Sequence, residues 1–145
     1  MMTEFEPQAQ AAFGDDTLPR SILLVDDDTM QAGVLQQRLT RQGYVTFLAH
    51  DGHAAMEIAR RHHPHVVLLD VALPDINGLD VCEALNDGQE TCDIPVIVLS
   101  GTGGAEMVRR ARAAGSRFYV HKPYDPNVLL ALIEDAMADD DFDWT

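Results

Sequence analysis

The chain has few basic residues and few cysteines. Its 10 Lys and Arg stand against 24 Asp and Glu, which gives a formal net charge of −14. This excess of negative charge counts against a surface that binds nucleic acid or an anionic membrane. Cys82 and Cys92 form no Cys-x-x-Cys pair, so nothing in the sequence indicates a secreted disulfide framework.

Long hydrophobic runs are also missing. No stretch approaches the ~20 consecutive apolar residues that a membrane-spanning helix needs. The N-terminus lacks the basic residues followed by an apolar stretch that mark a secretory signal. We therefore expect a cytoplasmic protein with no insertion into a membrane. A length of 145 residues with 46% hydrophobic content is typical of one globular domain with a normal-sized core.

The two ends of the chain differ from its middle. Residues 1–20 mix Glu, Gln, Ala, Asp and Pro without a sustained period, which predicts a flexible leader. Residues 139–145 contain four Asp among seven residues and indicate an acidic C-terminal tail. Residues 21–138, between these ends, form the predicted folded domain.

Apolar runs and amphipathic stretches alternate along the folded part. Predicted strands cover Ile22–Val25, Val45–Ala49, Val66–Leu69, Val96–Leu99 and Phe118–His121, and predicted helices cover Thr29–Gln42, Gly52–His63, Leu79–Asp87, Ala105–Ala114 and Pro126–Ala138. Stop signals follow the first four helices at Gly43, Pro64, Gly88 and Gly115. Five such repeats predict an α/β fold with a doubly wound parallel sheet and right-handed crossovers.

Acidic residues close two of the predicted strands. Ser21–Val25 is followed by three aspartates, of which Asp26 is the first, and Val66–Leu69 is followed by Asp70. Both runs indicate strands buried on both faces, and ligands bind beyond the carboxyl ends of such strands. Like charges ~5 Å apart repel by roughly 3 kcal/mol at an effective dielectric of ~20. The acidic cluster therefore requires a cation, a proton or a phosphoryl-transfer chemistry that uses the carboxylates.

Two later strands end in residues that complete a site for phosphoryl transfer. Ser100 follows the fourth predicted strand and Lys122 follows the fifth. Carboxylates bind Mg²⁺, a further carboxylate can form an aspartyl phosphate, and a hydroxyl and an ammonium can bind phosphoryl oxygens. Each residue alone has a simpler explanation, as a strand-end cap or a surface lysine, so the set carries the interpretation.

Together these residues resemble the receiver domain of bacterial two-component response regulators, of the chemotaxis-regulator type. The motifs that match are ILLVDDD at 22–28, LLDVALPDINGLD at 68–80, VIVLSG at 96–101 and FYVHKPY at 118–124. The resemblance covers about Ser21 to Ala138 and implies a flavodoxin-like sheet of five parallel strands in the order 2-1-3-4-5, with five helices. That order would place the first and third strands side by side.

The resemblance also implies a role for each site residue. Asp70 would be the phosphoacceptor, in a protein that is a switch with intrinsic autophosphatase activity and not an enzyme. Mg²⁺ would be bound by Asp26, Asp27, Asp70 and the backbone carbonyl of Ala72. Ser100 and Tyr119 would report phosphorylation, and Lys122 would bind the phosphoryl group. The phosphodonor would be a histidine kinase or a histidine phosphotransfer protein, as in a phosphorelay. A downstream protein would bind the face formed by the fourth helix, fifth strand and fifth helix.

Smaller features follow from the same resemblance. The peptide bond between Lys122 and Pro123 would be cis, and Gly78 would serve a loop in which glycine permits positive φ. Asp28 is a third acid where many receivers have another residue, and a helix cap is the preferred interpretation. Ala72 and Thr102 offer no amide or acid near the hydrolytic water.

Two other functions remain open from the sequence. A haloacid-dehalogenase-like phosphatase would use Asp26 as the nucleophile and Asp28 as the acid/base. Met30 stands where that motif has Thr or Val, and no acidic pair follows a strand after Lys122. The other alternative is a receiver-like scaffold that binds partners without phosphorylation.

Overall fold

The computed structural model of the chain describes residues 18–141. Within this range five strands alternate with five helices: β1 (Ser21–Val25), α1 (Thr29–Arg41), β2 (Val45–Ala49), α2 (Gly52–His62), β3 (Val66–Asp70), α3 (Gly78–Asp87), β4 (Val96–Ser100), α4 (Ala105–Ala113), β5 (Phe118–His121) and α5 (Pro126–Asp141). The strands form one parallel sheet in the order β2-β1-β3-β4-β5, which confirms the predicted fold class and places β1 beside β3.

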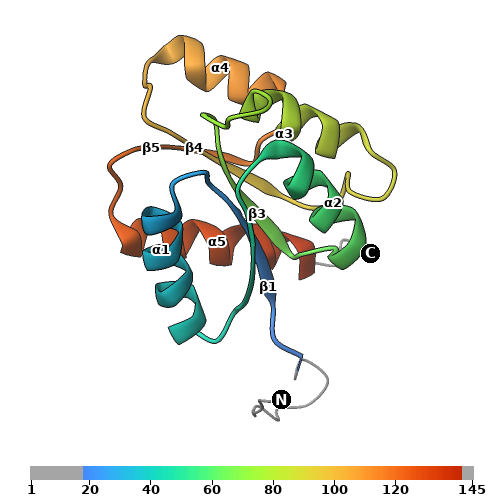
Figure 1. Cartoon of the computed structure of the whole chain (residues 1–145), viewed down its shortest axis with the longest axis vertical. Helices are drawn as coiled ribbons and strands as arrows, with labels where there is room; N and C mark the ends of the chain where they lie inside the picture. Colours follow the sequence, from blue (N-terminus) through green and yellow to red (C-terminus); the bar gives the residue numbers. More distant parts are fainter. Residues whose placement is uncertain (1–17, 142–145) are drawn as a thin grey trace.

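The helices cover both faces of the sheet. Figure 1 shows α1 and α5 on one side and α2, α3 and α4 on the other. Because successive side chains of a strand point to opposite faces, each central strand supplies both layers. In β1, Leu23 packs with the α2–α4 layer, whereas Ile22 and Leu24 pack with the α1–α5 layer. All five residues of β3 and of β4 are buried, as expected of central parallel strands.

Most predicted element boundaries agree with the structure to within one residue. Gly43 and Gly115 adopt φ values of +98° and +96° just after α1 and α4, where a left-handed residue ends a helix. The last helix is longer than expected, because it continues to Asp141 rather than ending at Ala138. Its buried face extends to Ala136 and Met137, so the packed part of the helix reaches close to the acidic residues. The predicted leader up to residue 17 and the last four residues of the tail lie outside the described residues.

No helix between residues 18 and 141 is both long and apolar enough to cross a membrane.

Candidate functional site

Two buried carboxylates meet at the carboxyl edge of the sheet. Asp26 follows β1 and Asp70 ends β3, and their side chains come close because Val25 pairs with Leu69 in the sheet register. Asp26 is 6% exposed and Asp70 is 7% exposed. The backbone N–H of Asp28 donates to Asp26 Oδ1 at 2.9 Å. The N–H of Ala72 donates to Asp70 Oδ1 at 2.9 Å, so the following loop orients each carboxylate.

The Lys122 ammonium lies beside both carboxylates and offsets part of their charge. Its Nζ lies 2.7 Å from Asp70 Oδ2 and 3.9 Å from Asp26 Oδ2. Lys122 comes directly after β5 and precedes the cis bond to Pro123, which the sequence predicted. Burial lowers the pKa of Lys122, but the hydrogen bond to Asp70 and the two negative charges outweigh it and raise the pKa above its ordinary value. Lys122 is therefore a cation at neutral pH.

The pKa of Asp26 is raised above its ordinary value. Burial is the main cause, and the charges of Asp70 and Asp28 act in the same direction. The N–H of Asp28 and the charge of Lys122 oppose this shift without cancelling it. Asp26 is thus a buried carboxylate whose ionised form is disfavoured, mainly by burial, and a further cation beside it would stabilise that form.

Asp27 and Ala72 lie at the outer side of this cluster. Both are exposed. Among residues 18–141 no three His, Cys, Asp or Glu side chains converge closely enough to form a metal-binding group by themselves. The structure therefore brings Asp26, Asp70 and Lys122 together, and leaves the Asp27 side chain in solvent beside them.

Ser100 and Tyr119 meet at one carbonyl in the β4–α4 loop. The Ser100 hydroxyl, which is 2% exposed as a residue, donates to the Thr102 carbonyl at 3.0 Å and accepts from the Thr102 N–H at 3.0 Å. The Tyr119 hydroxyl donates to the same carbonyl. The two predicted switch residues are thus connected through Thr102, although they belong to different strands.

Asp28 has the structural role that the sequence analysis preferred. Its Oδ1 accepts from the backbone N–H groups of Met30 and Gln31, both at 3.1 Å, so Asp28 is the N-cap of α1.

The expectation for Gly78 was wrong. Positive φ among the described glycines occurs at Gly43, Gly104 and Gly115, and not at Gly78. Gly78 is instead required by close packing, because a Cβ there would lie 2.4 Å from the Asp70 carbonyl oxygen and 2.6 Å from Val71 Cα. A glycine at this position lets α3 begin directly against the end of β3.

One pair beside the site was not found from the sequence. Asp75, in the β3–α3 loop, accepts from the N–H of Gly52 at 2.8 Å and of His53 at 3.0 Å, and its Oδ2 lies 2.6 Å from His53 Nδ1. Those bonds, the Gly52 N–H foremost, hold the pKa of Asp75 below its ordinary value. The pair joins the loop that follows Asp70 to the start of α2. Its members are 22 residues apart, and no local pattern signals the contact.

Comparison with known proteins identifies this arrangement. The family model of the response regulator receiver domain matches residues 22–134. The chain belongs to the response regulator receiver family. It is 29% identical to the polar-differentiation response regulator DivK of Brucella ovis over 122 residues, which covers 84% of this chain and 99% of DivK.

Solved structures agree with this assignment. A CheY-like receiver domain protein from Methanospirillum hungatei JF-1 superposes with a TM-score of 0.80 at 25% identity, covering 86% of this chain and 98% of that one. The receiver domain of sensor histidine kinase PA1611 from Pseudomonas aeruginosa PAO1 superposes with a TM-score of 0.77 at 24% identity, covering 83% of this chain and 99% of that one. That structure contains a magnesium ion coordinated in its active-site cleft.

Membership of the receiver family confirms the main functional prediction. The chain is the receiver of a two-component system, which is a phosphorylation-controlled switch in signal transduction and a phosphoacceptor rather than an enzyme. Receivers act between a histidine kinase or phosphotransfer protein and a downstream target.

Proposed function

We propose that Asp70 accepts a phosphoryl group from a phosphohistidine and that Lys122 binds the phosphoryl oxygens. The contact of Lys122 Nζ with Asp70 Oδ2, at 2.7 Å, is the observation that carries this proposal. It places a cation beside one particular carboxylate of the acidic cluster, whereas Asp26 lies farther from the ammonium, at 3.9 Å. A phosphoryl group on Asp70 would bring its oxygens within reach of the same ammonium.

The proposed step is a displacement at phosphorus. A carboxylate oxygen of Asp70 forms a bond to phosphorus as the bond from phosphorus to the donor imidazole nitrogen breaks, and the imidazole leaves with the bonding electron pair. Lys122 offsets charge on the transferred oxygens, and Ser100 supplies a hydroxyl donor from the neighbouring strand. Ser100 has one hydroxyl hydrogen, which now points to the Thr102 carbonyl. Donation to the phosphoryl group therefore requires Ser100 to release Thr102.

Residues of this chain fit a magnesium ion. We propose that Asp26, Asp27, Asp70 and the Ala72 carbonyl would bind it, which is an all-oxygen set of the kind that Mg²⁺ prefers. The charge count supports this, since Asp26 and Asp70 together outnumber the single positive charge of Lys122 beside them. Mg²⁺ keeps several waters and needs few protein ligands, so three converging side chains are not required. When bound, the ion would neutralise negative charge on the phosphoryl oxygens.

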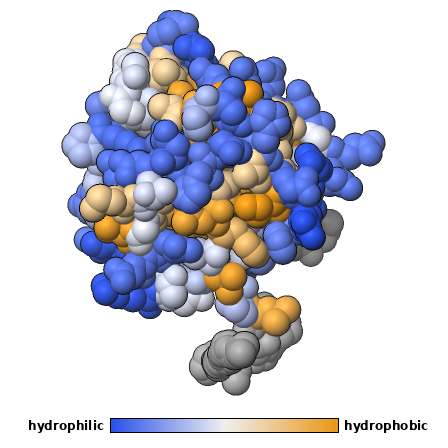
Figure 2. All heavy atoms as spheres, viewed as in Figure 1, coloured by the Kyte–Doolittle hydropathy of each residue, from blue (hydrophilic) through white to orange (hydrophobic). Residues whose placement is uncertain are grey.

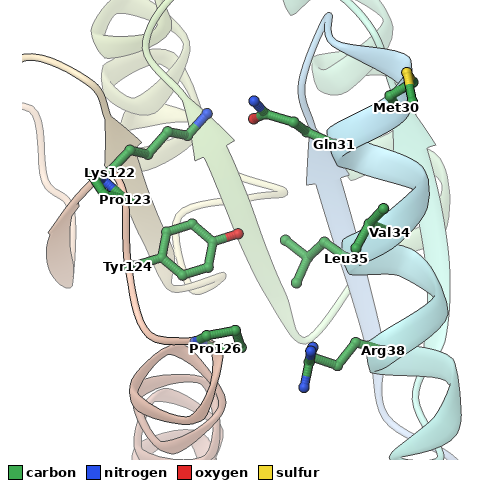
Figure 3. Close-up of a pocket in the computed structure, with 9 residues that line it drawn as sticks. All are labelled: Met30, Gln31, Val34, Leu35, Arg38, Lys122, Pro123, Tyr124 and Pro126. Carbon is green, nitrogen blue, oxygen red and sulfur yellow. The ribbon is translucent and has the colours of Figure 1, made fainter.

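The phosphodonor is proposed to dock on α1. A groove of about 620 Å³ lies between α1 and the segment that follows β5, and Figure 3 shows Tyr124 facing Leu35 and Lys122 extending toward Gln31 across it. Met30 is 80% exposed and Val34 is 66% exposed along its rim.

Charge also favours this surface. α1 contains Arg38 and Arg41 and no acidic residue, in a chain of net charge −14.

Figure 2 shows apolar side chains in a band across the middle of the view, at the level of α1 and α5, on a face that is otherwise mostly hydrophilic. Because one end of the groove is Lys122, a helix bearing the donor histidine could rest on Met30 and Val34 while it reaches Asp70.

Further proposals complete the functional description. The receiver unit comprises residues 21–138, in the cytoplasm, with residues 1–20 as leader and 139–145 as tail. The downstream protein binds the face of α4, β5 and α5, which includes the Tyr119 side of the sheet edge. Hydrolysis of the aspartyl phosphate by the protein itself ends the signal.

The phosphatase alternative has less support. It needs Asp28 as a free acid/base, yet the Asp28 carboxylate accepts two backbone N–H groups at the start of α1. It also needs Asp26 as the nucleophile, while Lys122 lies nearer to Asp70.

Incubation with acetyl phosphate and Mg²⁺, followed by measurement of intact mass, tests the proposal. Wild type should gain one phosphoryl group, and Asp70→Asn should gain none. Asp26→Asn serves as the matched control, since it also removes one buried charge next to Lys122 but leaves the acceptor. An adduct that persists in Asp70→Asn and disappears in Asp26→Asn would favour the phosphatase. No adduct on wild type would favour the scaffold.

A further inference from the structure

The exposed histidine at the end of β5 contacts the loop that carries the switch. β5 alternates its side chains, with Val120 in the α1–α5 core and Tyr119 packed against the opposite core. His121 lies two residues after Tyr119 and directly before Lys122. Because side chains two residues apart on a strand point to the same face, His121 shares the direction of Tyr119, toward the β4–α4 loop. In the sheet register His121 pairs with Ser100, the last residue of β4.

Two adjacent carbonyls of this loop are held from β5. The Tyr119 hydroxyl donates to the Thr102 carbonyl, and His121 Nε2 lies 3.2 Å from the Gly101 carbonyl oxygen. A carbonyl oxygen only accepts, so Nε2 carries the hydrogen in this contact. Gly101 directly follows Ser100, and the histidine therefore acts next to the hydroxyl that must move.

The loop is shaped to admit the imidazole ring. A Cβ at Gly103 would lie 3.1 Å from both Cδ2 and Nε2 of His121, which is tighter than an ordinary contact. A Cβ built at Gly101, two residues earlier, meets no atom within 4 Å. Because Gly103 has no side chain, the imidazole ring can lie against the loop and bind the Gly101 carbonyl.

We propose that His121 is a positioning residue that holds the β4–α4 loop, residues 101–104, in its unphosphorylated arrangement. The inference rests on the proposed phosphorylation of Asp70. Ser100 must release the Thr102 carbonyl before it can donate to a phosphoryl group, and that release removes a bond that holds the loop to the end of β4. The hydrogen bond from His121 to Gly101 opposes movement of the loop independently of Tyr119, so it lowers the population of the arrangement that binds the phosphoryl group.

The test measures the affinity of the full chain for beryllofluoride, an analogue of the phosphoryl group. The affinity is obtained from an NMR titration in saturating Mg²⁺. Loss of one neutral hydrogen bond that favours the unphosphorylated arrangement should make His121→Ala bind about fivefold more tightly than wild type. His121→Gln should return the affinity toward wild type, because its amide N–H can reach the same carbonyl. The thermal midpoints without beryllofluoride show whether a variant merely destabilises the fold.

A pair of glycine substitutions tests the ring contact. Gly103→Ala should displace the ring and tighten beryllofluoride binding in the same direction as His121→Ala. Gly101→Ala is the matched control, since it adds the same methyl group to the same loop in open space and should leave the affinity near wild type. In the His121→Ala background, Gly103→Ala should have no further effect, because the ring that it displaces is gone.

Equal or weaker binding by His121→Ala would overturn the inference, as would equal effects of the two glycine substitutions. Failure of wild type to bind beryllofluoride would overturn the proposed function, and the inference with it. Tight binding by wild type that His121→Ala leaves unchanged would overturn the inference alone.

Discussion

Replacing Lys122 with methionine should destabilise the protein by leaving Asp26 and Asp70 buried without their counter-ion. At an effective dielectric of ~20, the Nζ–Oδ2 distances of 2.7 Å and 3.9 Å correspond to gross attractions of about 6 and about 4 kcal/mol. Most of this is offset by the cost of removing the ammonium from water, and the Lys122 side chain is 23% exposed. Removing one partner of a buried pair costs about 3–5 kcal/mol. We expect the lower end, about 3 kcal/mol.

The loss should depend on pH and on Mg²⁺ in a defined way. The native pKa of Asp26 is already above its ordinary value of 3.8, and removal of Lys122 removes an interaction that lowers it. The native state of the variant then retains protons that the unfolded state has released, so its stability falls as pH rises above 3.8 through the native pKa. At lower pH the variant should approach wild type. Mg²⁺ should restore part of the loss at neutral pH.

Urea unfolding at pH 7 and at pH 4 measures these effects, with EDTA or with Mg²⁺ at about 10 mM, which is enough to occupy a site of millimolar affinity. Lys122→Arg is the matched control, since it keeps a cation at the site. A Lys122→Met protein as stable as wild type in EDTA at pH 7, or equally destabilised at both pH values, would refute the electrostatic reasoning.

The remaining predictions concern the metal, the Asp75 pair and the lifetime of the phosphorylated state. Millimolar Mg²⁺ should raise the thermal midpoint of wild type by mass action, and an equal rise in the double variant Asp26→Ala, Asp27→Ala would argue against a metal site. The folded pKa of Asp75 is lowered from 3.8, so ionised Asp75 stabilises the folded protein above pH 3.8, and this stabilisation is lost as pH falls below that value. Urea unfolding should therefore show that Asp75→Asn is less stable than wild type at pH 7 and similar to it in strong acid. Ala72 offers no side chain to orient the hydrolytic water, so Ala72→Asn should shorten the lifetime of the aspartyl phosphate by roughly tenfold, or about 1.4 kcal/mol in barrier. Equal decay rates measured side by side in Mg²⁺ would show that access through the Gly101–Gly104 loop limits hydrolysis instead.

Local features of this protein were predictable from the sequence because the groups involved are neighbours in the chain. Asp28 caps α1 through N–H groups two and three residues later, and any chain that begins a helix there would offer the same donors. Strands β1 and β4, which end at Val25 and Ser100, follow from runs of branched apolar residues that must be buried on both faces. Through the family that they resemble, the motifs at these ends were sufficient to predict the sheet order.

The tertiary structure decided which of these residues touch. The contact of Lys122 with Asp70 joins residues 52 apart, and it forms because β3 and β5 end at the same edge of the sheet. Close packing, not backbone dihedral angles, explains Gly78, because the clash is with a strand that ends eight residues earlier. The contact of Asp75 with His53 joins a loop to a helix, and that of His121 with Gly101 joins a strand to a loop. A sequence encodes its local hydrogen bonds in adjacent residues, whereas contacts between distant segments exist only once the sheet has fixed the positions of those segments.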